Sequence, residues 1–144
     1  MSRDVVSELY LRELRQPYHG RTREEVLMWL CQSLGFCGER DRDNSSVAVF
    51  RVLLEAALED RGLTSSEIAE RCGLSRGSVI HHINRFKKRG LVIHVGNRYM
   101  LRRTTLSATL QEIKKDTLKI IDDLTLVAEE IDRKFGLYGH HGQK

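Results

Sequence analysis

Residues 64–101, TSSEIAERCGLSRGSVIHHINRFKKRGLVIHVGNRYML, carry the signals of two short helices joined by a tight turn. Thr64 followed by Glu67 is a capping box, in which each side chain satisfies a free backbone amide at the start of a helix. Gly73 ends that helix, because glycine readily adopts the left-handed conformation found after many helices. Ser75 is a favoured N-cap and begins the second helix. The segment therefore predicts a helix, a sharp turn and a second helix.

A β-hairpin is predicted directly after the second helix, which ends at Gly90. Residues 91–95, LVIHV, are rich in β-branched side chains, and residues 98–102, RYMLR, form the returning strand. Gly96-Asn97 between them is a two-residue turn signal. A helix-turn-helix unit followed by such a hairpin, the wing, is a winged helix. The predicted fold is mostly α with this small hairpin, with N-terminal helices and a long C-terminal dimerisation helix added to the winged helix-turn-helix.

Positive charge is concentrated in the same part of the chain. Residues 64–103 hold nine basic residues against two acidic ones, a net charge of +7, whereas the whole chain carries +4. The segments on either side are slightly acidic. Such a block is the electrostatic footprint of a surface that meets a polyanion. A merely solvated basic face is the alternative, and the coincidence of the charge with the helix-turn-helix pattern favours nucleic acid.

The second helix of the motif has one apolar face. Val79, Ile83 and Phe86 converge on one side at the helical period, so we expect them to face the core. His82 lies on the flank of that face and is expected to pack rather than to contact DNA. The opposite side carries Gly77, which costs about 1 kcal/mol relative to alanine in an exposed helical turn. Close approach of the helix backbone to DNA is a reason for a glycine there.

The residue types on the exposed side fit the major groove of double-stranded DNA. Arg76 is suited to the O6/N7 edge of guanine, Asn84 to adenine, and Ile80 to a thymine methyl group. Ile80 also has two other interpretations, an ordinary surface aliphatic or a contact with a partner protein. Basic residues farther along the helix and in the wing are suited to phosphates, which set register and affinity. The predicted DNA-binding residues are Arg76, Gly77, Ser78, Ile80, His81, Asn84, Arg85, Lys87, Lys88, Asn97, Arg98 and Arg102.

The same segment resembles the winged helix-turn-helix repressors of the ArsR, MarR and TrmB-like groups of archaea and bacteria. The resemblance implies a transcription regulator that occupies promoter DNA, with repression as the expected outcome. The cysteine motif of the arsenic sensors is missing, because Cys72 stands alone, so metal sensing is not implied. The elements that carry the resemblance are Leu63-Thr64, Glu67-Ile68-Ala69, Gly73-Leu74-Ser75, Val79, His82-Ile83, Phe86, Gly90-Leu91-Val92 and Gly96-Asn97.

The C-terminal part predicts one long helix over residues 107–135, with apolar residues alternating by three and four. Such a helix extends about 40 Å, and a domain of this size does not cover its whole apolar stripe. A coiled coil with a second copy would cover the stripe and place two recognition helices about one DNA turn apart. The alternative is that the helix folds back along the N-terminal helices. The predicted homodimer interface is Leu110, Ile113, Thr117, Ile120, Leu124, Val127 and Ile131.

The N-terminal part predicts three further helices. Residues 4–15 repeat apolar side chains at helical spacing, and a second helix begins at Thr22, where Glu25 completes a capping box. A third helix is expected to start at residues 44–46 and to run to about Arg61. The predicted organisation is N-terminal helices and a charged loop over 1–43, the winged domain over 44–104, the dimerisation helix over 105–136 and a mobile tail over 137–144.

Other classes of function have little support in the sequence. No GxSxG, P-loop or HExxH motif is present, so we predict neither enzymatic activity nor a cofactor. The three cysteines and six histidines lack the spacing of zinc ligands, so no metal is expected. The lack of a long apolar run and of a secretory signal predicts a cytoplasmic protein with no membrane partner. The sequence identifies no small-molecule effector.

Two alternatives stand beside a DNA-binding regulator. The first is a protein-interaction adaptor of transcription, replication or chromosome machinery that uses the same fold. Ile80 on the exposed face favours it, and the +7 segment disfavours it. The second is an RNA-binding winged helix, which competition between duplex DNA and structured RNA would discriminate.

Overall fold

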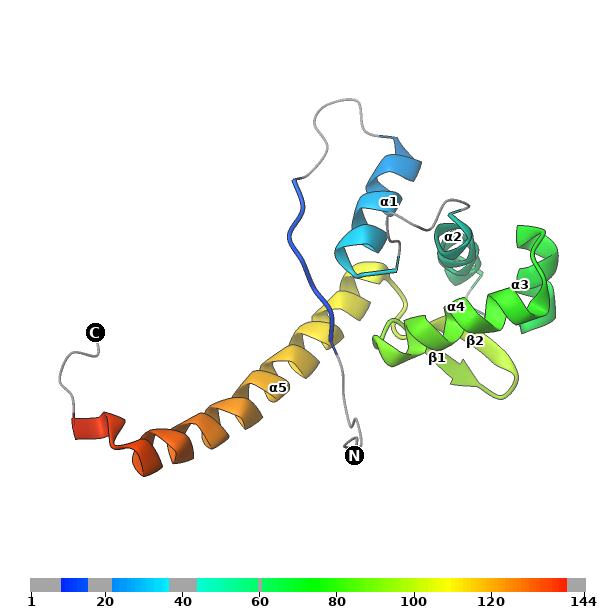
Figure 1. Cartoon of the computed structure of the whole chain (residues 1–144). Helices are drawn as coiled ribbons and strands as arrows, with labels where there is room; N and C mark the ends of the chain where they lie inside the picture. The colour runs from blue at the N-terminus through cyan, green and yellow to red at the C-terminus, as the bar shows by residue number, and fades with distance from the viewer. Residues whose placement is uncertain (1–8, 16–21, 37–43, 60, 140–144) are drawn as a thin grey trace. The chain divides into compact units, whose positions relative to one another are not determined.

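The structure, a computed structural model, describes residues 9–15, 22–36, 44–59 and 61–139. The chain divides into two compact units, Met1–Leu110 and Gln111–Lys144. The first contains four helices and a hairpin among its described residues, and most of the last long helix makes up the second (Figure 1). The elements are α1 Arg23–Ser33, α2 Ser45–Ala57, α3 Ser65–Cys72, α4 Arg76–Lys88, β1 Val92–Val95, β2 Arg98–Leu101, α5 Leu106–Phe135 and a 3₁₀ turn, Leu137–Gly139.

The predicted capping box at the start of α1 is confirmed. The backbone amide of Thr22 donates to Glu25 Oε1 at 2.7 Å, and the amide of Glu25 donates to Thr22 Oγ1 at 3.1 Å. These two bonds satisfy amides that have no partner inside the helix.

The prediction of a helix over residues 4–15 is wrong for the described residues 9–15, which form no regular element. The backbone amide of Arg12 instead donates to the carbonyl of Ser33 at 3.1 Å, and Trp29 Nε1 donates to the carbonyl of Arg15 at 3.1 Å. An isolated helix of this length is marginal in water. Hydrogen bonds to α1 therefore prevail over the helical pattern; residues 1–8 lie outside the described chain.

Helix α2 is shorter than predicted, because it ends at Ala57 and not near Arg61. A few residues after it, Leu63 pairs with Tyr99, with N···O distances of 3.0 and 2.8 Å in the two directions. This bridge adds a short third segment to the edge of the hairpin. A long-range contact therefore sets the end of α2, and the apolar periodicity did not contain that information.

Helices α3 and α4 form the predicted helix-turn-helix. Thr64 and Glu67 make both bonds of the second capping box, Gly73 has a left-handed φ of 70°, and the Ser75 hydroxyl accepts from the amide of Ser78 at 3.1 Å. Helix α2 packs against α3, α4 and β2, so it is the central element of this unit. Each local signal read from the sequence is confirmed here.

The core of the first unit is built around the apolar face of α4. Val79, Ile83 and Phe86 are fully buried, as predicted. The ring of Phe86 meets Phe36 edge-on at a centroid distance of 4.7 Å and lies 5.4 Å from Phe50. His82 is buried as well, and its Nε2 lies 2.8 Å from the hydroxyl of Ser45 at the start of α2. These contacts fix the rotation of α4 about its axis.

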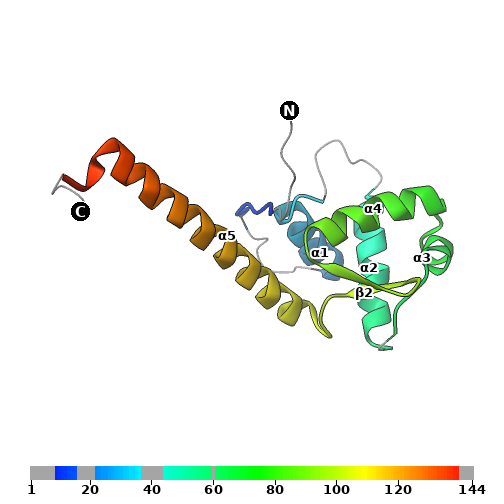
Figure 2. The same cartoon turned by 90° about the horizontal axis from the view of Figure 1, so that it is seen from below.

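The wing is a two-stranded antiparallel hairpin beside α4 (Figures 1 and 2). Val92 pairs with Leu101 and Val95 with Arg98, leaving Gly96 and Asn97 as the turn. Gly96 has a φ of 60°, and Asn97 stays at negative φ. Glycine with positive φ at the first central position is typical of a turn whose twist matches that of a hairpin.

Helix α5 spans the 30 residues Leu106–Phe135, close to the predicted 107–135. It begins where the Thr105 hydroxyl accepts from the amide of Ala108 at 3.0 Å. Ile113 is buried in the single chain, whereas no residue of 114–131 is. The tail predicted over 137–144 begins with the 3₁₀ turn; residues 140–144 lie outside the described chain.

Candidate nucleic-acid interface

The surface of α4 opposite the core is polar and exposed. The cap at Ser75 starts the helix so that Arg76 and Gly77 lie on the exposed part of its first turn. Burial of the apolar face turns the other side of the helix outward over its whole length. Of the predicted DNA-binding residues on α4, the exposed ones are Arg76, Gly77, His81, Asn84, Lys87 and Lys88, and the half-buried ones are Ser78, Ile80 and Arg85.

Three cations on this surface have no acidic partner among the residues that the structure describes. Arg76, Lys87 and Lys88 form no ion pair with any residue in the described ranges, whereas Arg23, Arg51 and Arg61 each pair with a glutamate. Lys87 Nζ lies 6.0 Å from the centroid of the ring of Tyr99, a residue of β2 in the wing. Uncompensated positive charge on an exposed helix face is suited to phosphate groups.

Arg85 of α4 and Arg89, the residue directly after the helix, point back into the protein. Arg85 Nη2 donates to the carbonyl of Gly35 at 2.8 Å, and Arg89 Nη1 donates to the carbonyl of Leu34 at 2.6 Å. The Arg89 guanidinium also lies over the rings of Tyr10 and Phe36, at 5.2 and 5.6 Å from their centroids. The C-terminal end of the recognition helix is thereby anchored to the end of α1. The carbonyl that Arg85 contacts lies 50 residues away in the chain, so this hydrogen bond was not foreseen from the sequence.

The wing arginines also have partners inside the protein. Arg98 Nη1 donates to the carbonyl of Gly62 at 2.8 Å and lies 3.3 Å from Glu67 Oε1, while Arg102 Nη1 donates to the carbonyl of Gly90 at 3.4 Å. Asn97 at the turn is exposed. The wing therefore presents its tip outward and uses these two guanidinium groups to hold the hairpin to its surroundings.

Glu67 connects the helix-turn-helix to the wing. Its carboxylate accepts from the backbone amide of Thr64 at 2.9 Å and lies against Arg98. The Thr64 amide, and then the charge of Arg98, lower the pKa of Glu67 below its ordinary value of 4.5. A carboxylate with a depressed folded-state pKa stabilises the fold above its unfolded pKa, and this contribution is lost as the pH falls through the folded pKa.

We therefore expect unfolding stability to decline below about pH 4.5, and the Glu67→Gln variant to lose part of this acid sensitivity. Urea unfolding from about pH 3 to 7 measures the slope of stability against pH for both proteins. Glu70→Gln makes the same change at an exposed position of the same helix and should keep the wild-type slope. Equal slopes for wild type and Glu67→Gln would contradict the expectation.

No group of three potential metal ligands occurs within the ranges that the structure describes. No helix among the described residues is both long and apolar enough to span a membrane.

Comparison with known families agrees with this geometry. Residues 51–93 match the family described as winged helix-turn-helix DNA-binding, a stretch that includes α3 and α4 completely. The match does not distinguish among the ArsR, MarR and TrmB-like groups. Comparisons with curated proteins and with solved structures found no match. The part of the chain that carries α3, α4 and the start of the wing thus has the winged helix-turn-helix fold, and its sequence is similar to that of DNA-binding domains with this fold.

Proposed function

We propose that the protein is a sequence-specific transcription regulator that binds double-stranded DNA as a homodimer and represses by occupying promoter DNA. The observation that carries the proposal is the exposed face of α4, which holds three cations without ion-pair partners among the described residues. It belongs to a domain whose family binds DNA.

The residues of this face divide into two roles. Arg76 and Asn84 read base edges, with the half-buried Ile80 beside them contacting a thymine methyl group. Lys87 and Lys88 bind phosphates and set the register of the helix on the duplex. Arg85, Arg98 and Arg102, whose guanidinium groups have partners within the protein, support the recognition helix and the wing.

The dimer part of the proposal rests on α5. Its residues from 121 to 131 are all exposed, including Leu124, Val127 and Ile131 of the predicted seam. An apolar stripe of this length in water is a marker of an interaction surface. Two-fold pairing would present two recognition helices to a near-palindromic operator.

The proposal predicts salt-dependent binding to duplex DNA. Fluorescence anisotropy with a duplex selected from a randomised library should show affinity falling steeply with salt, because bound phosphates release counterions. The Lys88→Gln variant should reduce the slope of log affinity against log salt by about 1 and weaken all sequences alike. Lys134→Gln, near the far end of α5, is the matched control. A wild-type slope near zero would overturn the phosphate-contact argument.

The adaptor alternative makes the opposite prediction in the same assay. It requires a partner protein recovered from nuclease-treated extract and no affinity for duplex DNA. The half-burial of Ile80 reduces the apolar surface on which that alternative depends. Competition with structured RNA tests the remaining alternative, since an RNA-binding winged helix would lose duplex binding in its presence.

A further inference from the structure

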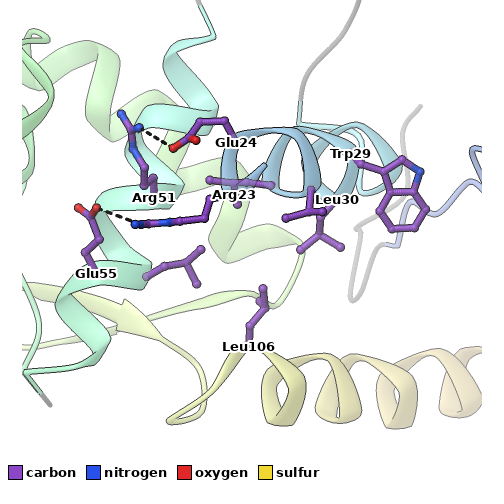
Figure 3. A pocket seen from close by; sticks show the side chains of 10 residues that line it. Arg23, Glu24, Trp29, Leu30, Arg51, Glu55 and Leu106 are labelled. Carbon is purple, nitrogen blue, oxygen red and sulfur yellow. Dashed lines mark ion pairs between the residues drawn. The ribbon is translucent and has the colours of Figure 1, made fainter. Parts of the chain in front are cut away.

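A pocket of about 490 Å³ lies between α1, α2 and Leu106, the first residue of α5. Figure 3 shows two ion pairs toward one end of it and Trp29 at the other. Volumes of this order are typical of sites for small organic ligands. The pocket is lined by Arg23, Glu24, Val26, Leu27, Trp29, Leu30, Arg51, Leu54, Glu55 and Leu106.

The wall of the pocket is predominantly apolar, because α1 leaves its hydrophobic side chains uncovered. Of the 11 residues of α1, only Cys31 and Ser33 are buried. Val26 remains 40% exposed, and Leu27, Trp29 and Leu30 are half-buried. Trp29 directs its indole N–H away to the carbonyls of Leu14 and Arg15, at 3.3 and 3.1 Å. The polar atom of the indole therefore already has acceptors outside the pocket.

The charged residues of the pocket neutralise one another. Arg23 of α1 pairs with Glu55 of α2 at 3.7 Å, and Glu24 of α1 pairs with Arg51 of α2 at 3.5 Å. Helix α1 supplies the arginine of the first pair and the glutamate of the second. The lining therefore has no net charge, and a charged ligand would have to break a pair or lie uncompensated against the apolar wall.

We propose that this pocket binds an uncharged, apolar small molecule with an aromatic or aliphatic body. The size of the pocket, the apolar wall contributed by both helices and the balanced ion pairs together select this class. The alternative occupant of the pocket is a helix from a second copy of the chain, and the experiments below distinguish the two.

The pocket has a structural connection to the recognition helix. Arg85 of α4 and the C-cap residue Arg89 donate hydrogen bonds to the carbonyls of Gly35 and Leu34, which directly follow α1. A ligand that moves α1 against α2 therefore moves the acceptors of these two hydrogen bonds and tilts the end of α4. The ligand would thus act as an effector of DNA binding, and this half of the inference rests on the proposed function.

Binding is tested with two probes that share one aromatic body. N-phenyl-1-naphthylamine is uncharged, and 1-anilinonaphthalene-8-sulfonate is its sulfonated counterpart. Trp29 is the single tryptophan of the chain, so energy transfer from tryptophan to a bound probe reports on the pocket. We expect saturable transfer to the uncharged probe and at least about tenfold weaker binding of the sulfonate. Equal or tighter binding of the sulfonate would overturn the assignment of ligand class.

Two variants test the location. Leu54→Phe fills the pocket, and Val26→Asp places a charge on its wall at a position exposed enough to leave folding intact. Each should weaken the uncharged probe by about tenfold or more. Leu58→Asp makes the same chemical change at a residue that is 90% exposed and outside the pocket, and should bind as wild type. Unchanged binding of the uncharged probe by Val26→Asp would overturn the location of the site. Energy transfer that appears only after a dimer dissociates would mean that a helix of a second copy, and not a small molecule, occupies the pocket.

Duplex affinity measured with and without saturating uncharged probe tests the coupling. A change of at least about threefold that Val26→Asp abolishes is the expected result. Probe binding with unchanged duplex affinity would overturn the effector role. Probe binding by a protein with no duplex affinity at all would overturn the proposed function and leave the pocket assignment standing.

Discussion

The Gly77→Glu variant is expected to bind duplex DNA on the order of a hundredfold more weakly than the wild-type protein. Gly77 lies on the exposed face of α4, in the turn that a recognition helix presents to base edges. A carboxylate there occupies the space between helix and groove and faces the phosphates with a like charge. Like charges brought together in an interface cost several kcal/mol, which exceeds the loss of any one phosphate contact.

Folding gives no reason for a glycine at position 77. A Cβ atom built there meets no atom within 4 Å beyond its chain neighbours and the backbone of its own helix, and Gly77 is not among the residues with positive φ. Acidic residues in the first turn of a helix interact favourably with its dipole, so glutamate should be tolerated or slightly stabilising. Loss of DNA binding by this variant would therefore not be explained by unfolding.

Fluorescence anisotropy with the selected duplex, together with thermal unfolding, measures both properties of the variant. Gly77→Ala is the informative intermediate, because it should stabilise the fold by up to about 1 kcal/mol while weakening DNA binding through its methyl group. Leu58→Glu adds the same charge at an exposed site away from α4 and should bind nearly as wild type. If Gly77→Glu bound the duplex as tightly as the wild-type protein, DNA would have to bind to a surface other than the exposed face of α4.

Local signals in the sequence were sufficient to predict the helix-turn-helix and the orientation of α4. The caps at Thr64 and Ser75 and the left-handed Gly73 depend on neighbouring residues alone, and all three are found where the pattern predicts them. The burial of Val79 and Phe86 follows from helical periodicity in the same way. Exposure of the opposite face is then a geometric consequence.

The misjudged features depend on partners that are distant in sequence. The pairing of Leu63 with Tyr99 ends α2 early, and hydrogen bonds to α1 hold residues 9–15 outside a helix. The hydrogen bond from Arg85 to the carbonyl of Gly35 could not be foreseen for the same reason, because its acceptor lies 50 residues away. Arg76, Lys87 and Lys88 were all predicted from the sequence as DNA-binding residues, but only the structure shows that they have no ion-pair partner among the described residues.

The second large effect is expected from α5. The Leu124→Asp/Val127→Asp double variant should weaken self-association on the order of a thousandfold or more, giving monomers at micromolar concentration. Leu124 and Val127 are 59% and 54% exposed, so the proposed pairing with a second copy would cover apolar side chains that the described residues leave in water. Burying one such side chain stabilises a dimer by about 1.5–3 kcal/mol. Each substitution is present in both copies of a two-fold dimer, so its effect on association is doubled.

Sedimentation velocity measures the association directly, and Leu126→Asp is a stringent control. Leu126 is 65% exposed on the same helix, but it lies on the side opposite the predicted seam. Both variants therefore introduce aspartate at exposed apolar positions of α5, and only the seam variant should dissociate. Equal association of the two would contradict the seam.

Duplexes with one or two half-sites separate the loss of the dimer from the loss of the DNA-binding surface. The seam variant leaves α4 and the wing unchanged, so its affinity for an isolated half-site should equal that of the wild type. It should lose the additional affinity that the wild type gains from a second half-site about one helical turn away, because that gain requires two connected recognition helices. Equal discrimination between the two duplexes by both proteins would mean that α5 does not join two DNA-binding domains. The uncovered apolar stripe would then require a partner other than a second copy of the chain.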